Sequence, residues 1–336
     1  VPGVLGHLNL QRERFRDNFN VCFVFLLRKF AYKYFIRRAP DFFDWHSGIF
    51  EIPTELETIE QKSSRLAFEG VYQKYQSLSE EERREKLVEI QELLSDERLP
   101  ETRKSDLWSE LGKYYKVSED YEAAIASYNH ALETKFKDDK TWLNRGFALF
   151  QLERYEEAVE SYNRAIELNP DNENAWIIRG WTLEKLRHYK EAIASYDRAI
   201  ELNPEDEHAW KFRGDLLEEL GRYEEAVQSY NYAIQLNPKT DLIWITRGFT
   251  LKQLGRNEQA LRSYDCAIEI NPKNKLNWEF RGEVLLQLER YEEAIQSYDR
   301  AIELNPEDEH AWIMRGFMLK QLERYEEAIQ SYDRAI

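Results

Sequence analysis

The chain has 336 residues, of which 33% are charged and 14% aromatic, and its formal net charge is −16. With 20 tyrosines and 9 tryptophans, it is too rich in aromatic residues for the class of disordered acidic chains. Residues 1–50 contain eight Lys/Arg and four Asp/Glu, so this segment carries +4 and the remainder carries −20. We expect so acidic a remainder to repel nucleic acid and anionic membranes.

Cysteine usage and the apolar runs indicate a cytoplasmic protein. Cys22 and Cys266 are the only cysteines, and two isolated cysteines indicate a reducing compartment rather than a disulfide scaffold. The longest apolar run, residues 21–27, is too short to cross a bilayer, and charged residues precede it where a secretory signal would be apolar. The chain begins with Val1 and stops inside a repeat at Ile336, so we expect a fragment of a longer protein.

Residues 1–53 share no periodicity with the rest of the chain. The pattern predicts short helices over residues 8–15 and 29–39 and a buried strand over residues 21–27, which needs partner strands. We therefore expect a truncated α/β segment. The runs LNLQRERFRDNF, FVFLL and RRAPDFFDWHSGIFEIP resemble the end of a nucleotide-binding module of bacterial NACHT/STAND-like signalling ATPases. In that family a sensor array of repeats follows the ATPase, but this chain has no GxxxxGK[ST] loop to hold phosphates.

Residues 54–104 are predicted to form two connector and capping helices. Ser79 followed by three glutamates is a favourable start for the second helix, because the hydroxyl can cap the first turn and the acids complement the helix dipole. The Leu99-Pro100 pair is expected to end that helix, since the residue before a proline disfavours helical dihedral angles.

The rest of the chain is a repeat. Tryptophan recurs every 34 residues from Trp108 to Trp312, followed by Gly after four residues, Ala after 16, Tyr after 20 and Ala after 23. Each repeat contains two apolar stripes at helical spacing, and two helices alone cannot bury both, so the repeats must stack. The predicted repeats are 105–138, 139–172, 173–206, 207–240, 241–274, 275–308 and the incomplete 309–336.

This pattern of Trp, Gly, Ala, Tyr and Pro resembles the tetratricopeptide repeat (TPR) family over residues 105–336. The resemblance implies an all-α, right-handed superhelical solenoid of helical hairpins, in which the first helix of each hairpin lines a concave groove. It implies a protein- or peptide-binding scaffold and says little about the ligand. The chain departs from the family in carrying Arg, where Leu is usual, three residues after the tryptophan in six repeats.

The sequence offers no catalytic or metal-binding signature. No HExxH, CxxC or GxSxG motif occurs, and the six histidines are scattered. The many Glu pairs fall at predicted helix starts, where they act as capping and solubilising charges. We therefore expect no enzyme activity, no cofactor and no metal.

The arginines three residues after each tryptophan have two interpretations. In the first, each lies over an aromatic ring and pairs with an acid such as Asp197, Asp265, Asp299 or Asp333. In the second, they form a positive track for acidic peptides or phosphate groups. The column comprises Arg145, Arg179, Arg213, Arg247, Arg281 and Arg315.

Two positions per repeat vary in a way that the fold does not require. They lie one and five residues after the tryptophan, one helical turn apart, and should face the groove. They read Lys211/Asp215 in the fourth repeat and Glu279/Glu283 in the sixth, which predicts an apolar groove interrupted by acidic patches. The alternative is that the apolar side chains pack against the adjacent repeat. The predicted groove residues are Leu143, Phe147, Ile177, Trp181, Ile245, Phe249, Ile313 and Phe317.

These features predict a non-catalytic scaffold that binds a protein or peptide in its groove, as the sensor or recruitment arm of a larger bacterial signalling protein. We expect the ligand to be an apolar segment with some basic residues. Two other functions fit the sequence: self-assembly into homo-oligomers through the solenoid ends, including the uncapped last repeat, and nucleic-acid contact by the basic N-terminal segment.

Phe249→Ala is expected to leave folding nearly intact and to weaken partner binding, because a groove aromatic is exposed in the free protein. Trp244→Ala removes a buried ring and is expected to cost about 3–5 kcal/mol of stability. Thermal melting of both variants checks this. A fall in melting temperature for Phe249→Ala as large as that for Trp244→Ala would show that Phe249 is structural.

Overall fold

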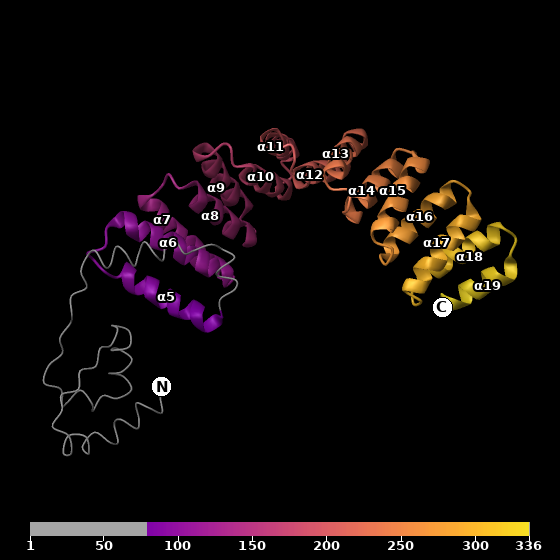
Figure 1. Cartoon of the computed structure of the whole chain (residues 1–336), viewed down its shortest axis with the longest axis horizontal. Helices are drawn as coiled ribbons and strands as arrows, with labels where there is room; N and C mark the ends of the chain where they lie inside the picture. The colour runs from indigo at the N-terminus through magenta and orange to yellow at the C-terminus, as the bar shows by residue number, and fades with distance from the viewer. Residues whose placement is uncertain (1–78, 336) are drawn as a thin grey trace, which may run out of the picture. The chain divides into compact units, whose positions relative to one another are not determined.

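The computed structural model describes residues 79–335, which form fifteen α-helices and no strand (Figure 1). The expected α/β segment at 1–53, its resemblance to a signalling ATPase and the first connector helix lie outside the described residues. The described residues fall into two compact bodies, divided after Phe136.

The first body contains the second connector helix and the first repeat. Ser79 caps its helix as predicted: its hydroxyl accepts a hydrogen bond from the N–H of Glu82 (3.3 Å), and the Glu82 carboxylate accepts one from the N–H of Ser79 (2.8 Å). A small apolar core of Ile90, Leu99 and Leu107 joins the first two helices. The helices are α5 (Glu80–Leu94), α6 (Glu101–Val117) and α7 (Tyr121–Thr134).

The expectation that α5 ends at Leu99-Pro100 was wrong by about one helical turn. The chain leaves the helix after Leu94, where the Ser95 hydroxyl donates to the carbonyl of Glu92 (2.7 Å). Pro100 instead stands at the N-cap of α6. A proline fits a helix start, because the first N–H groups of a helix have no partner within the helix.

The second body is a stack of six helical hairpins, and the start of each hairpin lies 34 residues after the one before. In Figure 1, α8 and α10 lie on the inner side of the curved stack and α9 and α11 on the outer side. The helices are α8 (Asp139–Gln151), α9 (Tyr155–Leu168), α10 (Glu173–Lys185), α11 (Tyr189–Leu202), α12 (Glu207–Glu219), α13 (Tyr223–Leu236), α14 (Asp241–Gln253), α15 (Asn257–Ile270), α16 (Lys275–Gln287), α17 (Tyr291–Leu304), α18 (Glu309–Gln321) and α19 (Tyr325–Arg334).

Within each hairpin, a tyrosine of the second helix lies against the glycine of the first. A Cβ atom added to Gly146 would lie 2.5 Å from Cε1 of Tyr162, and the corresponding distance is between 2.4 and 2.8 Å in every repeat. The rings of Tyr128, Tyr162 and the next four equivalents are fully buried. The glycine column is therefore required because only a residue without a side chain admits the ring.

The tryptophans hold the loop before each first helix. The indole Nε1 of Trp176 donates to the carbonyl of Pro170 at 3.0 Å, and the same bond recurs in the next four repeats at 2.8–3.0 Å. These bonds satisfy the indole N–H and tie the loop to the helix that it enters.

The turn inside each hairpin contains a residue with a positive φ angle. Glycine occupies this position in two repeats, as at Gly221 (φ 71°), while glutamate or arginine occupies it elsewhere, as at Glu153 (φ 59°). A residue with a Cβ atom is strained in this left-handed conformation.

Two substitutions in one hairpin should therefore shift stability in opposite directions. Gly146→Ala is expected to destabilise the protein by about 1–3 kcal/mol, because the new methyl group overlaps the buried Tyr162 ring. Glu153→Gly is expected to stabilise it by about 0.5–1 kcal/mol through relief of the positive φ angle. Urea denaturation followed by circular dichroism measures both. Shifts of the same sign would contradict this account of the hairpin.

Candidate peptide-binding surface

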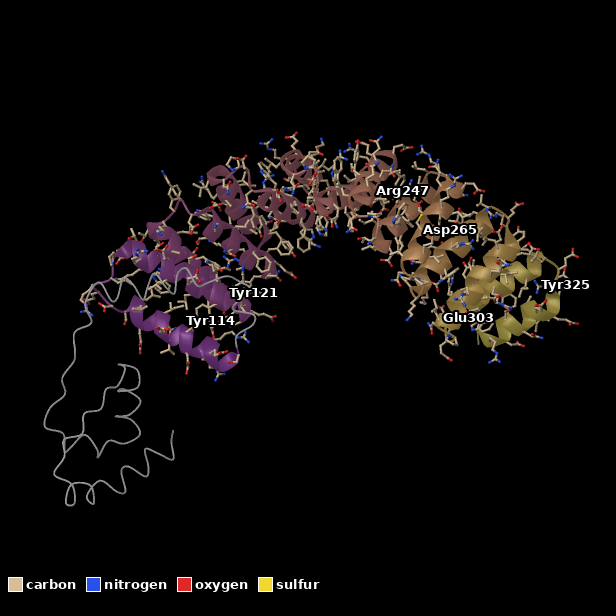
Figure 2. The ribbon with its side chains drawn as sticks, in the orientation of Figure 1. Tyr114, Tyr121, Arg247, Asp265, Glu303 and Tyr325 are labelled. Atoms are coloured by element: carbon tan, nitrogen blue, oxygen red, sulfur yellow. The ribbon has the colours of Figure 1, made fainter. Side chains whose placement is uncertain are left out.

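The arginine column bridges three helices. Arg247, labelled in Figure 2, donates from Nε to Asn231 of the preceding repeat (2.7 Å) and from Nη1 to Ser263 of its own second helix (2.6 Å). The same pair of bonds is made by Arg179, Arg213, Arg281 and Arg315, with Asp in place of Asn in the last three of these. Arg145 donates to Ser161 (2.5 Å).

These bonds give the arginines a structural role. Three of them form ion pairs with an acid of the preceding repeat, and about a fifth of each of these arginine side chains is exposed. The pairs are Arg213 with Asp197, Arg281 with Asp265 and Arg315 with Asp299. Four members of the column lie over the tryptophan of their own repeat, namely Arg145, Arg179, Arg247 and Arg315. An anion that used this column would have to break hydrogen bonds that join adjacent repeats.

The predicted groove residues differ in exposure. Trp181, Phe249 and Phe317 are exposed by 43%, 36% and 38%, and Ile313 is exposed as well. Leu143, Phe147 and Ile245 are half-buried, and Ile245 packs on the core of the later repeats. Ile177 is buried, in a cluster with Leu183 and Tyr196. The predicted surface therefore combines four exposed apolar side chains with four that are half-buried or buried.

A third groove position was missed by the sequence reasoning. It lies eight residues after the tryptophan, one helical turn beyond the second predicted position, and in the second repeat it is Phe150. The Phe150 ring lies 4.8 Å from the ring of Trp181 in the next repeat, and 5.3 Å from that of Tyr155. We call Phe147, Phe150 and Trp181 the aromatic patch. The two predicted groove positions lie one and five residues after the tryptophan. Continuing along the same helix face by one more turn would have identified Phe150.

Lysines pair with the acids of both expected acidic patches. In the sixth repeat, Glu279 is buried and contacts Lys275 at 3.3 Å, while Glu283 contacts Lys252 of the preceding repeat at 2.6 Å. In the fourth repeat, Asp215 pairs with Lys211 at 2.5 Å. Lysines thus neutralise the acids that the sequence pattern singled out.

Other acids form a cluster without a cation. Glu184 of α10 and Glu218 and Glu219 of α12 lie close enough to interact electrostatically, directly or through Asp215, and none of the three forms an ion pair within the described part of the chain. Burial raises the pKa of Glu184, and the nearby charges of Glu219 and Asp215 raise it further, against a hydrogen bond from Tyr196 that lowers it. Burial and the same two neighbours raise the pKa of Glu218. We call Glu184, Glu218 and Glu219 the carboxylate cluster.

The hydroxyls of the tyrosine column reach the floor of the groove. Tyr196 donates to Glu184 (2.6 Å) and Tyr230 donates to Asp215 (2.9 Å). In the second repeat, phenylalanines replace both acceptors, and the hydroxyl of the fully buried Tyr162 has no hydrogen-bond partner among residues 79–335. The Thr182 hydroxyl lies beside it and donates to the backbone carbonyl four residues earlier (2.7 Å), and the buried hydroxyls of Tyr264 and Tyr298 are unpaired in the same way among these residues. An unpaired buried hydroxyl costs about 1–3 kcal/mol.

Sequence comparison identifies the repeat. Profiles described as tetratricopeptide repeat match residues 105–138, 139–172 and 161–194, and another of the same description matches 179–240, 247–309 and 281–336. The chain belongs to the TPR family. A comparison with curated protein sequences gave no match.

Solved TPR structures share the fold. The C-terminal part of a TPR protein from Cytophaga hutchinsonii superposes with a TM-score of 0.61 at 15% identity, over 67% of this chain and 92% of its own. A TPR protein from Parabacteroides merdae gives 0.51 at 20% identity, over 79% and 98%. YrrB, described as a TPR protein with an unusual peptide-binding site, gives 0.48 at 21%, over 59% and 97%.

Two further properties of the described residues bear on function. Among the helices of residues 79–335, none combines the length and apolar character that a membrane crossing requires. The same residues contain no grouping of three or more His, Cys, Asp or Glu side chains that is suited to a metal ion.

The tyrosine column provides a matched test of the groove floor. Tyr196→Phe is expected to destabilise the protein by about 1.5–3 kcal/mol, because the half-buried Glu184 loses its donor. Tyr162→Phe removes a hydroxyl that has no partner among the described residues, so stability should stay unchanged or rise. Denaturant unfolding of both variants measures the difference. Equal destabilisation would mean that the Tyr162 hydroxyl is satisfied in solution.

Proposed function

We propose that this TPR array is a non-catalytic, cytoplasmic scaffold that binds a protein or peptide along the first helices of its repeats. Bacterial signalling is the setting that the sequence favours. One observation carries the proposal: Trp181, Phe249, Ile313 and Phe317 are left exposed on the first helices of their repeats. Exposed large apolar side chains that recur along one face of a polar protein mark an interaction surface.

The tyrosine, glycine, tryptophan and arginine columns of the repeat have structural roles, so they are not candidates for the binding surface. The tyrosines and glycines join the two helices of a hairpin, the tryptophans hold the loops, and the arginines join neighbouring repeats. The positions one, five and eight residues after the tryptophan vary between repeats while the tryptophan, glycine, alanine and tyrosine columns stay constant. Variation on a constant scaffold is expected where specificity resides.

Self-association through α19 is a second candidate. Tyr325, labelled in Figure 2, and Ile329 are exposed by 57% and 59% on this helix. Light scattering over a concentration series separates the two proposals. A monomer at all concentrations supports the scaffold, and growth in mass that Tyr325→Glu abolishes supports self-association.

The scaffold proposal is tested by capture from lysate with three matched proteins. The groove variant carries Phe147→Ser, Trp181→Ser, Phe249→Ser and Phe317→Ser. The control variant carries Ser at four exposed leucines outside the groove positions, Leu220, Leu236, Leu242 and Leu276. We expect a partner retained by the wild type and the control variant and lost from the groove variant, at equal helical content by circular dichroism.

The same partner captured by all three proteins would show that the groove aromatics are incidental. Loss of the partner from the control variant as well would place the binding surface elsewhere on the repeats.

A further inference from the structure

The aromatic patch and the carboxylate cluster are adjacent. Trp181 and Glu184 lie three residues apart on α10, so they stand one helical turn apart on the same face. Phe150 of the preceding repeat contacts Trp181, and Asp215 and Glu219 of the following repeat act electrostatically on Glu184. Two tyrosines of α11 connect the acids, since Tyr196 donates to Glu184 (2.6 Å) and Tyr189 donates to Glu219 (3.5 Å). Within one turn of α10, the groove therefore changes from aromatic to acidic.

The aromatic patch occupies positions that carry hydrogen-bond acceptors in the next two repeats. At the two groove positions that supply Tyr196 and Tyr230 with carboxylate acceptors, the second repeat has Phe150 and Phe147. The fully buried hydroxyl of Tyr162 consequently has no hydrogen bond within the part of the chain that the structure describes. The buried hydroxyls of Tyr264 and Tyr298 are likewise unpaired in this part of the chain, so folding does not require an acceptor here and side chains that serve a ligand can occupy these positions.

The carboxylate cluster lacks a cation of its own. The two basic residues of α12 are already paired, Lys211 with Asp215 and Arg213 with Asp197. Lys185 lowers the pKa of Glu184 from a distance but forms no ion pair with it in the described residues. By contrast, the acids of the sixth repeat are paired with lysines of α14 and α16. Glu184 and Glu218 are half-buried and Glu219 is exposed, and carboxylates that repel one another gain when a cation binds among them.

We propose that repeats two to four bind a peptide segment that places an aromatic or aliphatic side chain on the aromatic patch and a lysine or arginine among the carboxylate cluster. The proposal rests on the scaffold function and names the chemistry of its ligand. A helical ligand would carry the two side chains three or four residues apart, because Trp181 and Glu184 are separated by one helical turn. The apolar residues at Phe249, Ile313 and Phe317 would contact other parts of the ligand without selecting for charge.

The test is selection of peptides from a random phage-display library, with inserts of about three helical turns, against the wild-type chain. A second selection uses a cluster variant with Glu184→Gln, Glu218→Gln and Glu219→Gln, in which the amide oxygen at position 184 can still accept the Tyr196 hydrogen bond. A charge-matched control variant carries Glu201→Gln, Glu205→Gln and Glu224→Gln at exposed positions away from the cluster. Circular dichroism confirms that all three proteins are folded.

We expect peptides selected on the wild type and on the control variant to combine an aromatic or aliphatic residue with Lys or Arg. The Lys/Arg enrichment should be lost on the cluster variant. A synthetic peptide of the selected sequence should bind the cluster variant about tenfold more weakly than the control variant, with a smaller salt dependence.

Two results would overturn the inference, and they differ in what they imply for the scaffold. Peptides selected without Lys/Arg enrichment, or with the same enrichment on the cluster variant, refute the basic ligand and leave the groove as a binding surface. If no peptide is enriched on any of the three proteins, both the inference and peptide binding by the groove fail.

Discussion

The contact between a tyrosine ring and the glycine opposite sets the geometry of every hairpin. Because a Cβ atom at Gly146 would lie 2.5 Å from the Tyr162 ring, the two helices approach as closely as the ring permits. This contact buries the ring and directs its hydroxyl toward the groove side of the first helix, where Glu184 meets Tyr196. The floor of the candidate binding surface thus follows from the same contact that holds the hairpin together.

Adjacent repeats are joined by hydrogen bonds of the arginine column. Each arginine of the column donates to the second helix of its own repeat and, from Arg179 onward, to the second helix of the repeat before. A planar guanidinium with several donors suits this bridging better than a lysine ammonium would. The arginine bonds and the tyrosine–glycine contacts occupy fixed positions of the repeat. The other groove positions can therefore vary between repeats without loss of the fold.

The groove reflects a balance between stability and recognition. Where a carboxylate accepts the tyrosine hydroxyl, the floor is polar and satisfied, as at Tyr230 and Asp215. Where phenylalanines take these positions, the groove gains an aromatic patch and the hydroxyl of Tyr162 loses its partner among the described residues. The third repeat combines both, with Trp181 in the aromatic patch and Glu184 as the acceptor for Tyr196, so the order of repeats sets the pattern of apolar and acidic contacts along one face.

The sequence by itself determined the fold, because a strict 34-residue period of Trp, Gly, Ala and Tyr leaves few ways to bury two apolar stripes. It also indicated the face that carries Trp181 and Phe249, since those positions vary beside constant ones. The tertiary structure decided what spacing could not. It paired the arginines with groups 16 residues away on both sides, buried Ile177, and paired Glu283 with Lys252. It also brought Phe150 against Trp181 and gathered carboxylates from α10 and α12. These contacts join residues of different helices, so they depend on how neighbouring repeats stack, which periodicity along one helix does not specify.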